Sequence, residues 1–139
     1  MSHISRIEVR IDDLEALRDA CVKLGFQFME GQTTYKWYGR WVGETQLPEG
    51  IIEDDLGKCH HAIIVPGCEY EIGVVQRENS YILLWDSWYR GGLKKKIGKN
   101  AGILKQAYSV ERIRREARKK AYRVIEKRTD QGIRLVLSR

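Results

Sequence analysis

Three short apolar segments follow one another in the middle of the chain, with only tight turns between them. They are residues 62–65, 70–74 and 81–85. The turn Pro66-Gly67 separates the first two, and the polar residues 77–80 separate the last two. Connections this short join antiparallel strands, because a parallel pair needs a crossover of about a dozen residues or more. The sequence therefore predicts a central antiparallel meander.

The start of the chain predicts a strand, a helix and a second strand. Residues 7–11 alternate apolar and charged side chains, as in a strand with one buried face. Asp12 is a suitable N-cap for the helix that follows, and Glu15 completes a capping box. Gly25 suits the C-terminal end of this helix, and residues 26–28 then resume a strand.

The C-terminal third predicts a helix followed by a hairpin. Apolar residues recur at helical spacing over residues 104–117, and a turn at 130–132 separates two strand-like segments. Segment 14–30 can be aligned with segment 110–126 so that their apolar positions coincide. A degenerate ferredoxin-like duplication would produce this match, and so would two amphipathic helices that share a common pattern. Both interpretations predict an α+β fold, with two main helices packed on one face of an antiparallel sheet.

A single domain is expected for residues 1–139, since the chain has the length of one domain. No apolar run approaches the roughly 18 residues of a membrane span, and the first residues contain no apolar signal core. Three cysteines make an odd count, which argues against a secreted disulfide framework. We therefore expect a cytoplasmic protein without a membrane partner, and self-association is left open.

Two segments interrupt the regular patterns. Residues at about 43–58 combine glycines, a proline and three consecutive acidic residues, which predicts a long acidic surface loop. Loops of this length in small domains often serve binding. Residues at about 91–102 are rich in glycine and lysine and predict a second loop. It is either a phosphate-binding loop ahead of a helix or a flexible, solvated loop, and it lacks the Walker A order of residues.

Charge is distributed unevenly along the chain. Residues 1–89 hold 8 Lys+Arg and 15 Asp+Glu, a net charge of −7, and residues 90–139 hold 17 and 4, a net charge of +13. An anionic partner for the C-terminal third is one explanation. Pairing between the acidic first helix and the basic second helix is the other. The basic helix at 112–120 is accordingly either a surface that follows a nucleic-acid backbone or a solvated outer face.

All four tryptophans fall into two short clusters, at residues 35–41 and 85–90, and each cluster also carries tyrosine and arginine. Flat aromatic faces beside fixed cations suit a ligand with a π-system and negative charge, such as a nucleotide or a nucleic acid. We expect the first cluster to lie on a strand whose tryptophans point inward and whose Tyr38 and Arg40 point outward. The second cluster leads directly into the glycine- and lysine-rich segment and is the expected centre of a site.

A ligand-binding set follows from these patterns. Its members are Tyr38, Arg40, Trp88, Tyr89, Arg90, Lys94, Lys95, Lys96 and Lys99. The cations of this set would bind phosphate groups, a base would stack on Trp88 or Tyr38, and the acidic loop would close over the ligand. No catalytic residue and no cofactor is predicted.

A metal site has weaker support. Cys59, His61 and Cys68 are the candidates, because thiolate and imidazole groups bind zinc. Cys59 and His61 share a face if they lie on one strand, but the paired CxxC spacing of a zinc ribbon is absent from the sequence. Half-buried cysteines beside an exposed histidine pair are the favoured alternative. No pattern orients a Cys–His pair for nucleophilic catalysis, so an enzyme is not predicted.

Both ends of the chain resemble a known family. Residues 1–5 and the helix end Leu24-Gly25-Phe26 are similar to the start of an uncharacterised chloroplast and cyanobacterial conserved open-reading-frame family, domain of unknown function 1257, with bacterial and phage relatives. Segments 116–122 and 130–137 resemble its C-terminal pattern, with Ala121 in place of the family's glycine. The resemblance implies a fold without a mechanism. Some members of the family lie beside genes for AAA-type ATPases.

The sequence and the resemblance together suggest three functions. The first is a non-catalytic binding protein that captures a small phosphorylated, nucleotide-like ligand, for which the phage relatives imply sequestration of a host immune signal. The second is a protein-interaction adaptor for an AAA-type ATPase, with exposed aromatics in a flat contact patch. The third is a single-stranded nucleic-acid binding module with a long basic groove and steep salt dependence.

Overall fold

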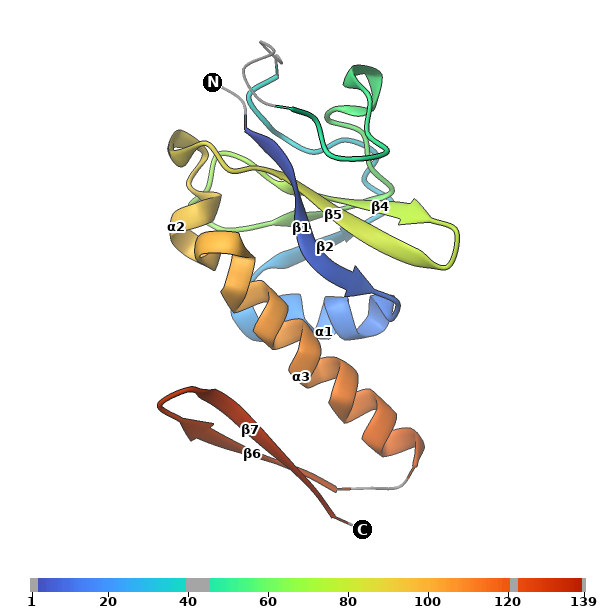
Figure 1. The fold of residues 1–139 in the computed structure, drawn as a ribbon, viewed down its shortest axis with the longest axis vertical. Coiled ribbons are helices and arrows are strands. Elements are labelled where there is room, and N and C mark those ends of the chain that lie inside the picture. The colour runs from blue at the N-terminus through green and yellow to red at the C-terminus, as the bar shows by residue number, and fades with distance from the viewer. Residues whose placement is uncertain (1–2, 40–45, 121–122, 139) are drawn as a thin grey trace.

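The main body of the molecule is a five-stranded antiparallel sheet (Figure 1). The computed structural model describes residues 3–39, 46–120 and 123–138. The strands are β1 (Ile4–Ile11), β2 (Gln27–Glu30), β3 (His61–Ile64), β4 (Ile72–Arg77) and β5 (Ser80–Asp86). Their order across the sheet is β1-β5-β4-β3-β2, and every neighbouring pair is antiparallel. The predicted meander, which is β3-β4-β5, is confirmed.

The helices lie on one side of this sheet (Figure 1). They are α1 (Leu14–Leu24), the short α2 (Leu93–Ile97) and α3 (Gly102–Lys119), with single 3₁₀ turns η1 (Glu53–Asp55), η2 (Tyr89–Gly91) and η3 (Lys99–Ala101). The long helices α1 and α3 pack against each other. The predicted α+β class, with two main helices on one face of an antiparallel sheet, is confirmed. Among the described residues no helix is both long and apolar enough to cross a membrane.

Helix α1 begins and ends at residues suited to those positions. The Asp13 carboxylate accepts a hydrogen bond from the backbone N–H of Ala16 (3.0 Å), and Gly25 has the left-handed φ of 78° that ends many helices. The N-cap is therefore one residue later than the sequence suggested. Asp12 is instead bound by Arg112 of α3, at 2.7 Å.

Apolar side chains are buried on both faces of the sheet. On the helix side, Leu17 of α1 and Leu104 of α3 pack in one cluster with Leu83 of β5. On the opposite side, residues that precede β3 in the chain pack in a second cluster with Val75 and Leu84. The sheet is thus covered by helices on one face and by irregular chain on the other.

The segment predicted as an acidic surface loop, at about 43–58, supplies part of that second cover. Glu53 and Asp54 of η1 are exposed, whereas Ile51 and Leu56 on either side of them are buried. The prediction of a surface loop is correct for most of the described residues of this segment, and the buried Ile51 and Leu56 anchor it on the sheet. Positions 43–45 lie outside the described residues.

The first aromatic cluster is held by glycines rather than by strand pairing. Residues 35–39, its described part, form no strand, so the prediction of a strand here is wrong. Tyr35 lies against Gly73 of β4, where an added Cβ would stand 2.5 Å from the ring. Trp37 lies against Gly57 in the same way, at 2.6 Å. Because glycine has no side chain, each ring can pack directly on the backbone beneath it. Trp37 points inward, as expected.

The glycine- and lysine-rich segment at about 91–102 is helical over most of its length, so the prediction of a loop is wrong. It contains α2, η3 and the first residue of α3. Leu93 and Ile97, four residues apart, are fully buried, and Lys94, Lys95 and Lys96 between them are exposed. An apolar i, i+4 pair is typical of a short amphipathic helix. The glycines and lysines around the pair obscured it in the sequence.

The chain ends in a hairpin that is separate from the main sheet. Strands β6 (Arg123–Thr129) and β7 (Gly132–Ser138) pair with each other, which confirms the predicted terminal hairpin. The strand after α1, β2, joins the five-stranded sheet, whereas the strand after α3, β6, does not. The two helix–strand units therefore occupy different places, and the strand order does not show a ferredoxin-like duplication.

Candidate functional site

Two arginines of α3 are paired with the acidic start of α1. Arg112 contacts Asp12 at 2.7 Å, and Arg115 contacts Asp13 at 3.0 Å. The hydrogen bond from Arg112 holds the pKa of Asp12 below its usual range. These pairs link the acidic and basic parts of the sequence within one molecule.

A further set of ion pairs ties the hairpin to both long helices. The carboxylate of Glu126 in β6 forms ion pairs with Lys23 of α1 at 2.9 Å and with Arg114 of α3 at 2.8 Å. Hydrogen bonds from these two cations lower the pKa of Glu126 to about 2. Lys23 also contacts Glu111 at 3.2 Å. Much of the positive charge of α3 is therefore paired inside the fold, as the intramolecular explanation of the charge asymmetry predicted.

A second group of basic residues, here the α2 basic group, has no such partners. It consists of Arg90, Lys94, Lys95, Lys96, Lys99 and Lys105. None of these side chains forms an ion pair with a carboxylate of the described residues. Unpaired positive charge attracts anions, and the pocket beside this group is therefore the strongest candidate for a site.

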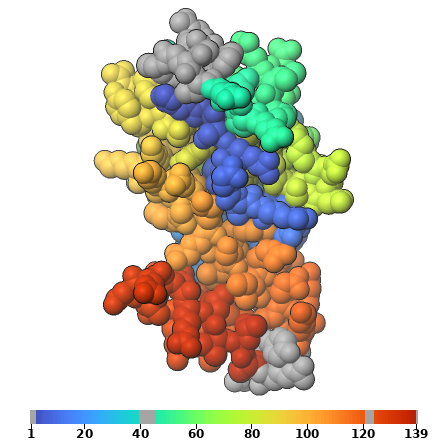
Figure 2. All heavy atoms as spheres, in the orientation of Figure 1, coloured from blue at the N-terminus to red at the C-terminus, as the bar shows by residue number. Residues whose placement is uncertain are grey.

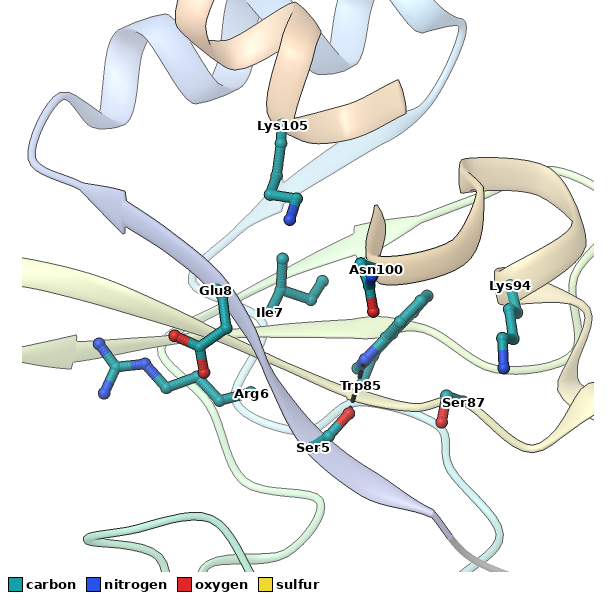
Figure 3. A pocket seen from close by; sticks show the side chains of 9 residues that line it. All are labelled: Ser5, Arg6, Ile7, Glu8, Trp85, Ser87, Lys94, Asn100 and Lys105. Carbon is teal, nitrogen blue, oxygen red and sulfur yellow. Dashed lines mark hydrogen bonds between the residues drawn. The ribbon is translucent and has the colours of Figure 1, made fainter. Parts of the chain in front are cut away.

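A pocket of about 400 Å³, the β1 pocket, opens beside this group (Figure 3). It lies between β1, the end of β5 and the helical segments α2, η3 and α3. Its lining residues are Ser5, Arg6, Ile7, Glu8, Trp85, Ser87, Lys94, Asn100 and Lys105. Two lysines of the α2 basic group thus belong to a concave site formed by distant parts of the chain.

Charged and polar side chains are divided between the two ends of the β1 pocket (Figure 3). Lys94 and Ser87 lie near one end, and Arg6 and Glu8 lie near the other. Lys105 extends from α3 toward the space between them. This arrangement suits a ligand with an anionic group near the lysines and a hydrogen-bond donor near the Glu8 carboxylate.

The wall of the β1 pocket is fixed by a buried tryptophan. The Nε1–H of Trp85 donates a hydrogen bond to Ser5 Oγ at 2.8 Å (Figure 3). Only 4% of Trp85 is exposed, and its ring belongs to the core on the helix side. Because its one donor is satisfied, Trp85 provides a rigid apolar surface with a serine hydroxyl at its edge.

The backbone beside the β1 pocket adopts an uncommon conformation. Asn100 and Ala101 have φ values of 59° and 58°, in the left-handed region that favours glycine. Asparagine tolerates this region better than most residues, whereas alanine is strained in it. Such strain is frequent at ligand sites, and here it directs Asn100 toward the pocket from the turn before α3.

Four predicted ligand-binding residues form one aromatic cluster, in which Tyr38, Tyr89 and Arg90 are exposed and Trp88 is half-buried against the core. The Trp88 ring lies 5.1 Å from that of Tyr38 and 5.9 Å from that of Tyr89, both edge to face. The Arg90 guanidinium lies over Trp88 at 5.6 Å. These contacts already occupy part of the Trp88 surface, while 71% of Tyr89 is exposed. Trp88 directly follows Ser87, a lining residue of the β1 pocket, in the chain.

A buried carboxylate joins the aromatic cluster to the start of β1. Asp86, which is fully buried, accepts hydrogen bonds from the backbone N–H groups of His3, Tyr38 and Trp88 at 3.0, 3.0 and 3.1 Å. A buried charge requires such partners. Asp86 therefore fixes three chain segments at the end of β5, where the β1 pocket and the aromatic cluster meet.

The structure separates the nine predicted ligand-binding residues. Lys94 lines the β1 pocket, and four residues form the aromatic cluster. Lys95, Lys96 and Lys99 are exposed and are not among the lining residues. Arg40 lies outside the described residues, as does Trp41. The expected centre at residues 88–99 is thus adjacent to the pocket and overlaps it at one lysine.

Sequence reasoning missed six polar residues of the β1 pocket: Ser5, Arg6, Glu8, Ser87, Asn100 and Lys105. They come from four separate parts of the chain, and only folding brings these parts together. A signal was present for two of them. Ser5 lies on the face of β1 that points toward the helices, where apolar residues follow it at every second position. Asn100 is a residue type that tolerates the left-handed conformation.

The three candidate metal ligands are not brought together. Cys59 belongs to the core cluster away from the helices and donates a hydrogen bond to the carbonyl of Gln32 at 3.2 Å, whereas Cys68 packs against the cluster on the helix side. The Nδ1 of His61 accepts a hydrogen bond from the N–H of Gly31. Burial raises the pKa of Cys59 to about 11, which disfavours the thiolate. No group of three or more potential ligands occurs within the part of the chain that the structure describes.

Comparison with known proteins gives no relative on which to base a function. No protein-family model matches the chain, and neither a curated protein nor a solved structure matches it. The resemblance of the two chain ends to the conserved open-reading-frame family stays a prediction. The β1 pocket and its surroundings are therefore the only basis for a function among the described residues.

Proposed function

We propose that this protein captures a small phosphorylated, nucleotide-like ligand in the β1 pocket and does not transform it. The observation that carries this proposal is the position of Lys94 and Lys105. Both line the pocket, and neither is paired with a described carboxylate. Arg112, Arg114 and Arg115 of α3 are paired with carboxylates of the fold, whereas these two lysines place unpaired charge at a concave site, so an anionic ligand is their natural partner.

The size and lining of the β1 pocket support a ligand of this class. Its volume of about 400 Å³ falls within the range of small-molecule sites, roughly 300–1,000 Å³. Lys94 and Ser87 would bind a phosphate group, with Lys105 as a second cation. Glu8 would accept a hydrogen bond from a hydroxyl or amino group at the other end. A base that extends past Ser87 would meet the aromatic cluster.

The lining favours binding without chemistry. It contains one carboxylate, that of Glu8, and no histidine or cysteine. Nucleophilic catalysis needs a nucleophile and a base within hydrogen-bonding reach of each other, and the lining residues provide no such pair. Capture of an intact ligand is the function that this set of side chains supports best.

The first test is to identify what the protein carries. Purified protein is denatured, and the released small molecules are examined by absorbance and mass spectrometry. We expect a phosphorylated compound with a nucleobase in molar proportion to the protein. Protein that releases nothing, and that gives no heat of binding with mononucleotides, dinucleotides or cyclic nucleotides, would contradict the proposal.

The second test locates the site with matched charge reversals. Lys105→Glu should weaken binding of the identified nucleotide by about tenfold or more, because the charge faces the pocket. Lys95→Glu is the control, since it makes the same change on an exposed residue outside the lining. Equal losses in both variants would show general attraction to a basic surface and would remove the β1 pocket as the site.

One observation supports the adaptor alternative. Tyr89 is 71% exposed, and 38% of Tyr38 is exposed in the same aromatic cluster. Exposed aromatic side chains are enriched where proteins bind each other. A Tyr89→Ala variant that retains nucleotide binding and loses capture of an AAA-type ATPase in a pull-down would assign this surface to a protein partner.

A further inference from the structure

The β6–β7 hairpin carries much exposed side-chain surface. It lies beside α3 and away from the five-stranded sheet (Figures 1 and 2). None of its side chains over residues 124–138 is buried, and about half of Ile125 and of Leu137 is exposed. A two-stranded hairpin is at best marginally stable unless a helix or further strands support it. The side chains on its exposed face therefore bear on the function of the hairpin.

The register of the hairpin defines its two faces, because directly opposed residues of an antiparallel pair point to the same side. One face includes Glu126 opposite Leu135 and Arg128 opposite Ile133. It is the inner face, since Glu126 pairs with Lys23 and Arg114. Ile133 also lines a hollow of about 280 Å³ with residues of α1 and α3.

The outer face carries cationic and aliphatic side chains. Lys127 stands directly opposite Arg134, and Ile125 stands directly opposite Val136. Neither Lys127 nor Arg134 forms an ion pair with a described carboxylate. Like charges in directly opposed positions destabilise a strand pair. This hairpin thus places two cations together where folding alone would favour opposite charges.

We propose that the outer face of the β6–β7 hairpin binds in the major groove of double-stranded DNA. A two-stranded β-ribbon fits this groove, which is about 12 Å wide. Lys127 would contact phosphate, Arg134 would reach phosphate or the acceptor edge of guanine, and the Ile125–Val136 pair would contact thymine methyl groups. The DNA charge would remove the repulsion between the two cations.

The surroundings of the hairpin fit a duplex. The last turn of α3, which leads into β6, carries Arg118, Lys119 and Lys120, all exposed. Lys119 has a long contact of 3.7 Å with Glu116, and the other two form no ion pair with described carboxylates. These residues add exposed positive charge close in sequence to the first strand of the ribbon, and a duplex carries phosphates along both sides of its groove.

Other partners fit this face less well. The major groove of an RNA duplex is too narrow and deep for a ribbon to enter. A second copy of the chain, related by a two-fold axis, would place the same cations against themselves. Competition with duplex RNA and light scattering test these two alternatives.

The test uses the full chain and a fluorescein-labelled DNA duplex of mixed sequence, about 25 base pairs long, which exceeds two helical turns. Fluorescence anisotropy over a series of salt concentrations should show binding whose affinity falls steeply with salt. Lys127→Glu should weaken binding by about tenfold or more at 0.1 M salt and should flatten the salt dependence. Lys95→Glu, an equal charge change at α2, should retain the wild-type affinity.

The same variant separates a lost contact from a lost fold. Lys127→Glu places opposite charges across the strands, so its thermal unfolding temperature should equal or exceed that of the wild type. If it does not fold, Lys127→Gln with Arg134→Gln removes both charges without reversal and should also weaken binding. The proposal is overturned if the wild type gives no anisotropy change at low salt, or if Lys127→Glu binds as tightly as Lys95→Glu. It is also overturned if duplex RNA or heparin competes as well as duplex DNA, or if Lys127→Glu abolishes a dimer seen by light scattering.

Discussion

Two basic regions of this molecule, one on α3 and one around α2, differ in how their side chains are paired. On α3, Arg112 and Arg115 each contact an aspartate at the start of α1, within 3.0 Å. Around α2, no basic side chain is paired with a described carboxylate, and two lysines line the β1 pocket. The two regions are similar in sequence, since both are runs rich in Lys and Arg. Their partners distinguish a charge that holds helices together from a charge that is available to a ligand.

The paired region on α3 should serve stability, and the β1 pocket should serve binding. Changes to the paired region should alter the free energy of unfolding and leave nucleotide affinity unchanged. Changes in the β1 pocket should do the reverse.

Lys23→Met should have the largest effect, because it leaves Glu111 without its cation. The Glu111 side chain is only 10% exposed and contacts Lys23 at 3.2 Å. Removal of one partner from a buried pair is costly, and the partial exposure of Lys23 reduces the cost here to about 2 kcal/mol. Urea unfolding measures the loss. The double variant Lys23→Met with Glu111→Leu should recover most of it, and a double variant no more stable than the single one would show that the pair is not the cause.

Asp13→Ala should cost about 1 to 1.5 kcal/mol, since it removes the N-cap of α1 and the partner of Arg115. Asp13→Asn is the matched control, because its amide oxygen still caps the helix while the ion pair is lost. The difference between the two variants in thermal unfolding therefore measures the cap alone. If both lose the same stability, the ion pair and not the cap is the main contribution of Asp13.

Acidification should weaken the contact between the hairpin and the helices. Hydrogen bonds from Lys23 and Arg114 lower the pKa of Glu126 from 4.5 to about 2 in the folded protein. Its contribution is therefore fully present above pH 4.5 and is lost as the pH falls toward 2. We expect about 1 kcal/mol after solvent screening is considered.

Comparison of the wild type with Glu126→Gln measures this contribution. The free energy of unfolding should fall more steeply in the wild type between about pH 4.5 and pH 2. Parallel curves for the two proteins would show that Glu126 is not an important titrating group. Nucleotide affinity at neutral pH should be the same in both, because Glu126 is not part of the β1 pocket.

Local patterns in the sequence were sufficient for most of the main sheet. Alternation identified β1, short turns identified the meander, and Gly25 marked the end of α1. These features depend on neighbours in the chain. The predicted strand at 35–41 is not formed over its described part, 35–39, where Tyr35 packs on Gly73, a residue distant in sequence that no local pattern identifies.

The candidate site was harder to predict than the fold. Ser5, Trp85 and Lys105 come from β1, β5 and α3, and only the packed sheet and helices place them around one pocket. The lysines of 94–99 were recognised as a cationic group, but the burial of Leu93 that orients them was not. Residue type predicted a cationic group in this region, and tertiary contacts determined which of its cations line the β1 pocket.

Asn100→Gly should produce the smallest change in stability and the clearest separation of the two regions. The backbone of Asn100 has a φ of 59°, which glycine adopts without steric cost. We therefore expect the protein to become more stable by about 0.5 kcal/mol or to remain unchanged. The side chain lost in this variant lines the β1 pocket, so nucleotide affinity should fall severalfold while the unfolding temperature does not. An Asn100→Asp variant keeps the turn-forming side chain but adds negative charge, and it should weaken binding further. If Asn100→Gly binds the nucleotide as tightly as the wild type, the asparagine serves the turn alone, and the lysines of the pocket must be tested without it.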